Sequence, residues 1–204
     1  MSGLILHSYR RCPFAIRVRM ALEEKGLPFQ VIEEDLGNRS AELLRLHPEG
    51  AVPLLLHEGV AIHESSIITE YIDERFPEHP LMPSAAMGRA QVRLWTYACN
   101  EFFKHDVDGF KYEWKDLAEE AREALLARLR GFLSKMDEAL ARAPFLLGSE
   151  LTLADIHVFP FYRQLTRARP DFASFFQYPR VDDWLARITG RPSFERVMAK
   201  IPAK

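Results

Sequence analysis

Cys12 is the residue of this sequence best placed to do chemistry, because its sulfur stands between an apolar run and the start of a helical pattern. The run Leu4 to Leu6 predicts a short strand buried on both faces. The helical period begins at Phe14, and Pro13 suits the first helical position because its missing N–H is not needed there. The sulfur should therefore lie at the positive end of a helix dipole, which stabilises a thiolate.

Arg10 and Arg11 stand directly before Cys12 and add positive charge to the predicted turn. Together with the helix start, they predict a thiol pKa below the ordinary value. The alternative is an inert buried cysteine that acts as a small hydrophobe. The proline behind the sulfur and the arginines before it favour the reactive interpretation. Position 15 is Ala15, so a C-x-x-C pair is absent and an oxidised intermediate would be a mixed disulfide or a sulfenic acid.

Composition places the chain among ordinary globular proteins and argues against some partners. With 204 residues it has room for one large domain or two small ones. The formal net charge of −2 gives no basis for a nucleic-acid partner. A local basic cluster is better explained by a solvated face or a small anionic ligand, and it consists of Arg10, Arg11, Arg17 and Arg19.

Metal binding, a disulfide scaffold and membrane insertion are not expected. Cys12 and Cys99 are far apart, and none of the seven histidines stands at metal-ligand spacing. We expect Cys99 to be a buried structural residue. The first residues show neither the basic region nor the apolar length of a signal peptide, and no stretch approaches the roughly 18 apolar residues of a membrane span. These features predict a cytoplasmic protein.

Hydrophobic periodicity predicts two domains of different class. The first 80 residues alternate as β-α-β-α-β-β-α, with a hairpin turn at Glu58-Gly59 and a helix capped by Ser65. A stretch with three prolines follows and marks a linker, and after it only helical patterns occur. We therefore predict an α/β domain over 1–79, a linker over 80–85 and an all-α domain over 86–204.

The helical domain contains one strong local signature and one aromatic stripe. Thr152 and Asp155 have the spacing of a capping box, which we assign to folding, and the helix that follows is apolar on most sides and therefore central. A long helix over 88–114, bent near Gly109, carries aromatic residues that are either core or the lining of an acceptor pocket. These are Phe102, Phe103, Phe110, Tyr112 and Trp114.

The whole chain resembles a cytosolic glutathione transferase with a thioredoxin-like N-terminal domain. The turn Cys12-Pro13-Phe14-Ala15 is similar to that of the omega and other cysteine-type classes, of which this chain looks like a bacterial-style member. The remaining resemblance rests on motifs in the family's order: Val52-Pro53, Glu64-Ser65, the proline-rich linker and Thr152-x-x-Asp155.

The resemblance implies roles for seven residues. Cys12 would be catalytic and face the sulfur of glutathione, the co-substrate. Pro53 would be a cis-proline that presents the Val52 backbone to the cysteinyl part of glutathione. Glutathione would be bound by Phe14, Arg39, Val52, Pro53, Glu64 and Ser65.

Three of these residues hold the two ends of glutathione in this interpretation. Glu64 and Ser65 would bind the γ-glutamyl end, and Arg39 would pair with the glycine carboxylate. Simpler alternatives remain open at this point. Pro53 is also explained as a strand-edge proline, Ser65 as a helix cap and Arg39 as a solvated surface residue.

The function expected from the site is glutathione-dependent thiol–disulfide exchange through Cys12: thioltransferase activity, deglutathionylation or dehydroascorbate reduction. One alternative is conjugation of glutathione to electrophiles, in which the attacking sulfur belongs to glutathione. Another is a non-catalytic interaction protein of the same fold. The resemblance also implies a homodimer whose partners are glutathione and a disulfide or electrophile.

Overall fold

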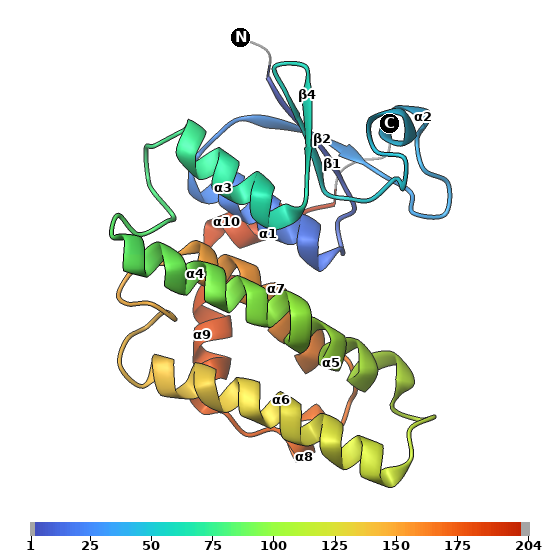
Figure 1. The fold of residues 1–204 in the computed structure, drawn as a ribbon, viewed down its shortest axis with the longest axis vertical. Helices are drawn as coiled ribbons and strands as arrows, with labels where there is room; N and C mark the ends of the chain where they lie inside the picture. The colour runs from blue at the N-terminus through green and yellow to red at the C-terminus, as the bar shows by residue number, and fades with distance from the viewer. Residues whose placement is uncertain (1–2, 201–204) are drawn as a thin grey trace. The chain divides into compact units, whose positions relative to one another are not determined.

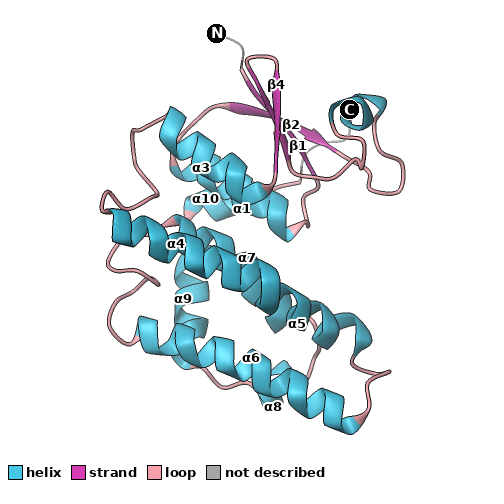
Figure 2. Cartoon of the chain, viewed as in Figure 1, coloured by secondary structure: helices cyan, strands magenta, loops and turns pink. Residues whose placement is uncertain are grey.

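The computed structural model describes residues 3–200, and its contacts divide the chain into two compact units. The first unit contains the chain up to Leu81 together with the segment from Arg191, and the second contains Met82–Gly190. Figure 1 shows the strands in the first unit only, and Figure 2 shows the same division by secondary structure.

The first unit contains a four-stranded mixed sheet with the strand order β2-β1-β3-β4. β1 pairs with β2 in parallel, whereas β3 is antiparallel to both β1 and β4. The elements follow the predicted β-α-β-α-β-β-α order and confirm the thioredoxin-like fold. They are β1 (Leu4–Ser8), α1 (Pro13–Glu24), β2 (Phe29–Glu33), α2 (Ala41–Leu46), β3 (Leu54–His57), β4 (Val60–His63) and α3 (Ser65–Arg75).

The core of this unit lies between the sheet and the helices α1 and α3, which pack against each other. Its side chains come from β1, α1, β3 and α3, so they fix the sheet against the helix that begins after Cys12. The turn at Cys12 is thus anchored on both sides by buried apolar contacts. The buried members are Leu4, Leu6, Val18, Leu22, Leu55, Ile68 and Ile72.

The last described helix, α10 (Pro192–Met198), packs against α1 of the first unit. Glu24 on α1 accepts hydrogen bonds from Arg191 at 2.6 and 2.7 Å and another from Ser193. In the sequence-based division this segment belongs to the domain 86–204, whereas its contacts group it with the sheet. The domain boundaries 1–79, 80–85 and 86–204 stay a prediction.

The second unit is helical apart from an isolated antiparallel bridge between Phe145 and Gly148. The predicted long helix is a continuous run in which π-helical turns η1 and η2 interrupt α-helix, the second beginning at Gly109, where we expected a bend. Such π-turns change the direction of side chains along a helix. The elements are α4 (Ala86–Ala98), η1 (Cys99–Phe103), α5 (Lys104–Asp108), η2 (Gly109–Glu113), α6 (Glu119–Leu140), α7 (Leu153–Thr166), α8 (Phe172–Phe175) and α9 (Pro179–Thr189).

Helix α7 is the centre of this unit, as its apolar sequence predicted. It contacts α4, α5, α8 and α9, and Phe159 and Tyr162 on it are fully buried. The capping box of Thr152 and Asp155 is present at its start. Within residues 3–200, no helix combines the length and apolar character that crossing a bilayer requires.

Candidate active site

Cys12 lies in the turn between β1 and α1, where it is the N-cap residue of the helix. Its backbone is extended (φ −69°, ψ 120°), and Pro13 occupies the first helical position as predicted. The Cys12 N–H donates to the Tyr9 carbonyl at 3.0 Å, and the Sγ donates to the Val52 carbonyl at 3.8 Å. The side chain is half-buried, so the sulfur sits at the helix start beside the loop that precedes β3.

The peptide bond between Val52 and Pro53 is cis, which is the geometry that the resemblance implies. Pro53 is buried and Val52 is half-buried. The strand β3 begins only at Leu54, after the cis bond, because the loop around that bond carries no ladder pairing. The Val52 carbonyl that meets Cys12 therefore belongs to this loop.

The pKa of Cys12 is raised, which contradicts the expectation of an acidic thiol. Burial of the sulfur is the main cause, and it outweighs the N–H groups of Ala15 and Phe14 at the helix start. The positive charges that favour the thiolate belong to Arg19 and Arg17. The expectation of an acidic thiol did not account for this burial, and it assigned the favourable charge to Arg10 and Arg11, which adjoin Cys12 in sequence.

Arg17 and Arg19 are the residues that sequence reasoning missed. Arg17 is 0% exposed and Arg19 is 3% exposed, although we placed both in a basic cluster explained by a solvated face or a small anionic ligand. A signal for their burial was present, because α1 is otherwise apolar on every side between Ala15 and Leu22. A helix of that kind is buried all round, and its arginines are buried with it.

The start of α3 combines an unusual backbone with a buried hydroxyl. Glu64, not Ser65, is the N-cap residue, and it has a positive φ of 67°. Ser65 is the first residue of the helix, which corrects its predicted place as the cap. Its Oγ is buried and accepts a hydrogen bond from Nη1 of Arg17 at 3.2 Å. The structure thereby links the predicted glutathione-binding hydroxyl to α1.

Phe14 and Arg39 are the remaining predicted binding residues. The Phe14 ring lies 5.1 Å from the guanidinium carbon of Arg17, within cation–π range. Arg39 is exposed, and its Nε donates to the Gly50 carbonyl at 2.9 Å. This bond holds the Arg39 side chain against the loop that leads to Val52. The catalytic role of Cys12 and the binding roles of the other six residues stay predictions.

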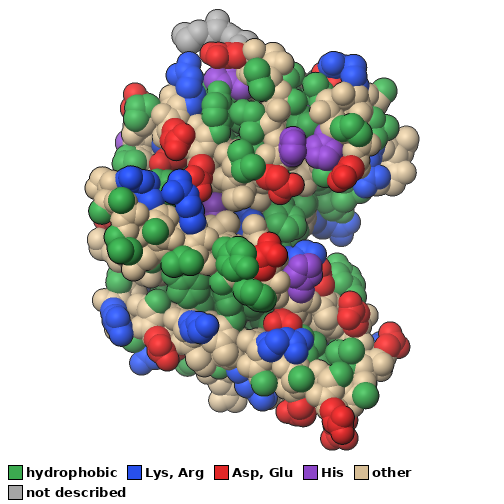
Figure 3. Space-filling view, viewed as in Figure 1, with side chains coloured by type: hydrophobic (Ala, Val, Ile, Leu, Met, Phe, Trp, Pro, Cys, Tyr) green, Lys and Arg blue, Asp and Glu red, His purple; other side chains and the backbone are tan. Residues whose placement is uncertain are grey.

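The predicted aromatic stripe is divided between core and surface. Phe103 and Phe110 are fully buried, and Phe103 stacks on Phe132 with 4.1 Å between ring centroids. Phe102 and Tyr112 are exposed. Figure 3 shows apolar side chains gathered over α4, where Met87, Leu94 and Tyr97 are exposed.

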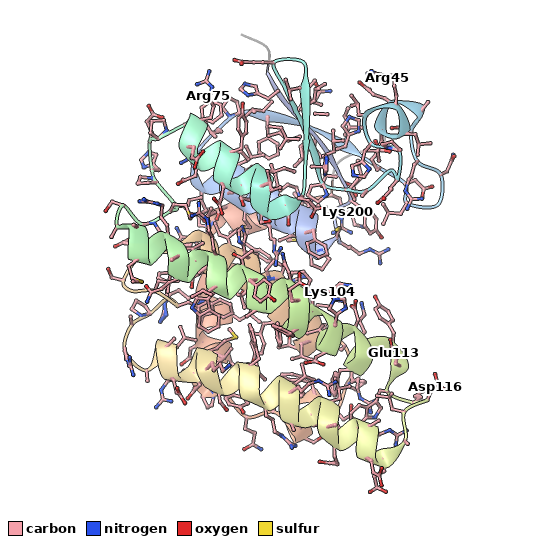
Figure 4. The ribbon with its side chains drawn as sticks, viewed as in Figure 1. Arg45, Arg75, Lys104, Glu113, Asp116 and Lys200 are labelled. Carbon is pink, nitrogen blue, oxygen red and sulfur yellow. The ribbon has the colours of Figure 1, made fainter. Side chains whose placement is uncertain are left out.

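A depression of about 520 Å³ in the second unit lies between α6 and the run from α5 to η2. Charged side chains line it, among them Asp106, which pairs with Arg128 at 2.8 Å, and Glu113, which is labelled in Figure 4 at the end of η2. None of the seven predicted site residues lines this depression. In the range 3–200, no group of three or more His, Cys, Asp or Glu side chains is arranged to hold a metal ion.

Two family models match the chain: "Glutathione S-transferase, N-terminal domain" over residues 6–80 and "Glutathione S-transferase, C-terminal domain" over residues 119–187. Among curated relatives, "Glutathione S-transferase U19" of Arabidopsis thaliana is 32% identical over 93% of this chain and 87% of its own length. These matches show that the chain belongs to the glutathione S-transferase family.

Solved structures of the family are similar over nearly the whole chain. The Tau class glutathione S-transferase of mango is 25% identical with a TM-score of 0.86, covering 97% of this chain and 93% of that one. Rice GST1, solved in complex with glutathione, is 28% identical with a TM-score of 0.80, covering 97% and 91%. Glutathione transferase Omega 3C of Trametes versicolor is 25% identical with a TM-score of 0.84, covering 99% and 91%.

Proposed function

We propose that this protein is a glutathione-dependent thiol transferase in which Cys12 forms a mixed disulfide with glutathione. One observation carries the proposal: a cysteine, the residue that can form such a disulfide, stands at the start of α1 with its Sγ 3.8 Å from the carbonyl that precedes the cis-proline. Family membership and the glutathione complex of rice GST1 support glutathione as co-substrate.

The binding site would be built on three loops of the first unit. Val52 would present its backbone to the cysteinyl part of glutathione, and Glu64 and Ser65 would bind the γ-glutamyl end at the start of α3. Arg39 would pair with the glycine carboxylate, and Phe14 would contact the ligand beside Cys12.

The exchange reaction needs two attacks at sulfur. The Cys12 thiolate attacks the glutathione sulfur of a mixed disulfide R–S–S–G, which forms Cys12–S–S–G and releases R–S⁻. A glutathione thiolate then attacks the same bond, which forms oxidised glutathione and regenerates the Cys12 thiolate. No second protein cysteine takes part, so Cys99, fully buried in the second unit, is dispensable.

A second candidate is conjugation of glutathione to electrophiles, and one specific observation favours it. The raised pKa of Cys12, caused mainly by burial, keeps this side chain as a thiol near neutral pH. A thiol can donate a hydrogen bond to the thiolate of bound glutathione, which then attacks the electrophile. The similarity to a Tau class structure is compatible with this reaction as well.

Assays of both reactions on the wild type and on Cys12→Ser separate the two candidates. Thiol transfer should be lost in Cys12→Ser, because a serine hydroxyl is not ionised near neutral pH and cannot form a disulfide. Conjugation should persist, since serine also donates a hydrogen bond. Cys99→Ser is the matched control and should keep both activities. Full thiol transfer in Cys12→Ser would refute the proposed function.

We further propose a cytoplasmic homodimer. The exposed apolar side chains along α4, Met87, Leu94 and Tyr97, support a surface that a second copy covers. Light scattering coupled to size-exclusion chromatography tests the state: a mass near twice 23.6 kDa is expected, and a monomer at all concentrations contradicts it.

A further inference from the structure

Arg19 occupies an unusual place for a residue with a permanent charge. It lies on α1, 3% of its surface is exposed, and its Nε has no hydrogen-bond partner among the residues that the structure describes. Its Nη2 donates to the Arg10 carbonyl at 2.5 Å. A cation that is buried with a donor left over is costly unless an anion compensates it.

The hydrogen bond from Arg19 reaches the turn that carries Cys12. Arg10, two residues before the sulfur, is held at its carbonyl by Arg19 and at its N–H by the Glu33 carboxylate, 2.7 Å away. The peptide units on either side of the Arg10 Cα are therefore both fixed, one from the end of β2 and the other from α1. This double attachment restricts where the Cys12 sulfur can lie.

We propose that Arg19 is a positioning residue for the chemistry of Cys12: it fixes the Tyr9–Arg11 turn and supplies the buried cation that stabilises a thiolate at the start of α1. The inference rests on the proposed function in taking Cys12 as the reacting sulfur.

The charges around the sulfur agree with this assignment. The charge of Arg19 lowers the pKa of Cys12 more than the charge of Arg17 does. Both charges act against the larger effect of burial. Arg17 also donates to Ser65, so part of its hydrogen-bonding capacity serves another group. Burial lowers the pKa of Arg19 to about 10, which still leaves it cationic at neutral pH, while the charges of Glu33 and Cys12 favour its charged form and that of Arg10 opposes it.

Alkylation by iodoacetamide as a function of pH tests the proposal without glutathione. The measurement uses a Cys99→Ser background, in which Cys12 is the remaining thiol. Arg19→Met should move the inflection of the rate to higher pH and slow alkylation at pH 7 several-fold, because the cation that favours the thiolate is gone. Arg11→Met is the matched control, since Arg11 is exposed and bonds to Tyr9, and its profile should equal that of the parent.

Glu33→Gln gives the opposite sign and does not depend on the folding of the Arg19 variant. The amide oxygen can still accept from the Arg10 N–H, but the negative charge that partly neutralises Arg19 is removed. The inflection should therefore move to lower pH. Two results together would overturn the proposal. The first is an unchanged alkylation profile in Glu33→Gln, and the second is an Arg19→Met variant that either has an unchanged profile or does not fold.

The outcome is separable from that of the proposed function. A protein without any thiol transfer can still show the shifted alkylation profile, which would support the role of Arg19 and refute the reaction. Unshifted profiles in a protein that does transfer thiols would refute the role of Arg19 alone. Circular dichroism of each variant identifies losses that come from unfolding.

Discussion

The guanidinium of Arg17 donates from Nη1 to the hydroxyl of Ser65 at 3.2 Å, and both side chains are almost fully buried. The bond joins α1, which begins after Cys12, to the first residue of α3. It leaves the Ser65 hydroxyl with its own proton free to be donated, because the oxygen serves as acceptor toward arginine. This polarity suits a hydroxyl that binds a carboxylate.

Ser65→Ala should weaken glutathione binding by about 1–3 kcal/mol, the range for a hydrogen bond to a charged group. Isothermal titration calorimetry measures the change directly. The neighbouring Ser66→Ala is the control, because Ser66 is half-buried and is not among the predicted binding residues. Equal affinity in the two variants would remove Ser65 from the binding site.

Asp155→Asn should destabilise the protein by about 2–4 kcal/mol, because every bond to this buried carboxylate comes from a donor. Its Oδ1 accepts from the Leu146 N–H and from the indole of Trp184, both at 2.9 Å. Its Oδ2 accepts from the backbone and hydroxyl of Thr152, both at 3.0 Å. In Asp155→Asn, the side-chain amide nitrogen replaces one of these two oxygens. It is a donor and would face two donors at either position, so their hydrogen bonds are lost.

Urea unfolding of Asp155→Asn measures this loss, and Asp183→Asn is the control on the exposed surface of α9. The control should unfold like the wild type within about 0.5 kcal/mol. A loss below about 1 kcal/mol in Asp155→Asn would mean that the network rearranges around the amide.

Glu24→Gln should reduce stability at neutral pH and lose this effect in acid. Burial tends to raise the pKa of Glu24, but the bonds from Arg191 and Ser193 outweigh it and hold the pKa below its usual range. A carboxyl whose folded-state pKa is depressed stabilises the fold above its unfolded-state pKa of about 4.3, and this contribution is lost as the pH falls through the folded-state value.

Free energies of unfolding at several pH values between about 3 and 7 test the Glu24 prediction. The difference between wild type and Glu24→Gln should be constant above about pH 5.5 and shrink below about pH 4.3. Glu23→Gln is the matched control, because its partner Arg196 is 55% exposed and such pairs contribute little. A difference that persists unchanged in acid would contradict the assignment to this carboxylate.

Much of the fold was readable because its signals are local. Pro13 marked the start of α1, Glu58-Gly59 formed the hairpin, and Thr152 with Asp155 opened α7. Each signal depends on residues within about four positions of each other, where backbone geometry dictates side-chain type.

The features that were missed depend on distant packing. The pKa of Cys12 is set mainly by burial of the sulfur, which no local pattern reports. Arg10 and Arg11 adjoin Cys12 in sequence, yet the charges that favour its thiolate come from Arg17 and Arg19, further along α1. The contact of α10 with α1 joins Arg191 to Glu24 across most of the chain and has no sequence signal either.

Gly50→Ala should weaken glutathione binding as well as stability, whereas Gly59→Ala should affect stability alone. Both glycines have positive φ, 59° at Gly50 and 81° at Gly59, so alanine is strained by about 1–2 kcal/mol at either position. A Cβ at Gly50 would also collide with Cδ of Arg39, whose Nε bonds to the Gly50 carbonyl at 2.9 Å, while a Cβ at Gly59 meets nothing within 4 Å.

Thermal unfolding and glutathione calorimetry on the two glycine variants separate backbone strain at the substituted residue from displacement of the Arg39 side chain. We expect both variants to lose a similar amount of stability, and only Gly50→Ala to lose affinity for glutathione. Arg39 must move in Gly50→Ala, and the predicted contact with the glycine carboxylate moves with it. Arg39→Ala should then lower affinity about as much, and adding Gly50→Ala to it should cost no further affinity. If Gly50→Ala binds glutathione as well as Gly59→Ala does, Arg39 is a solvated surface residue and the carboxylate is bound elsewhere.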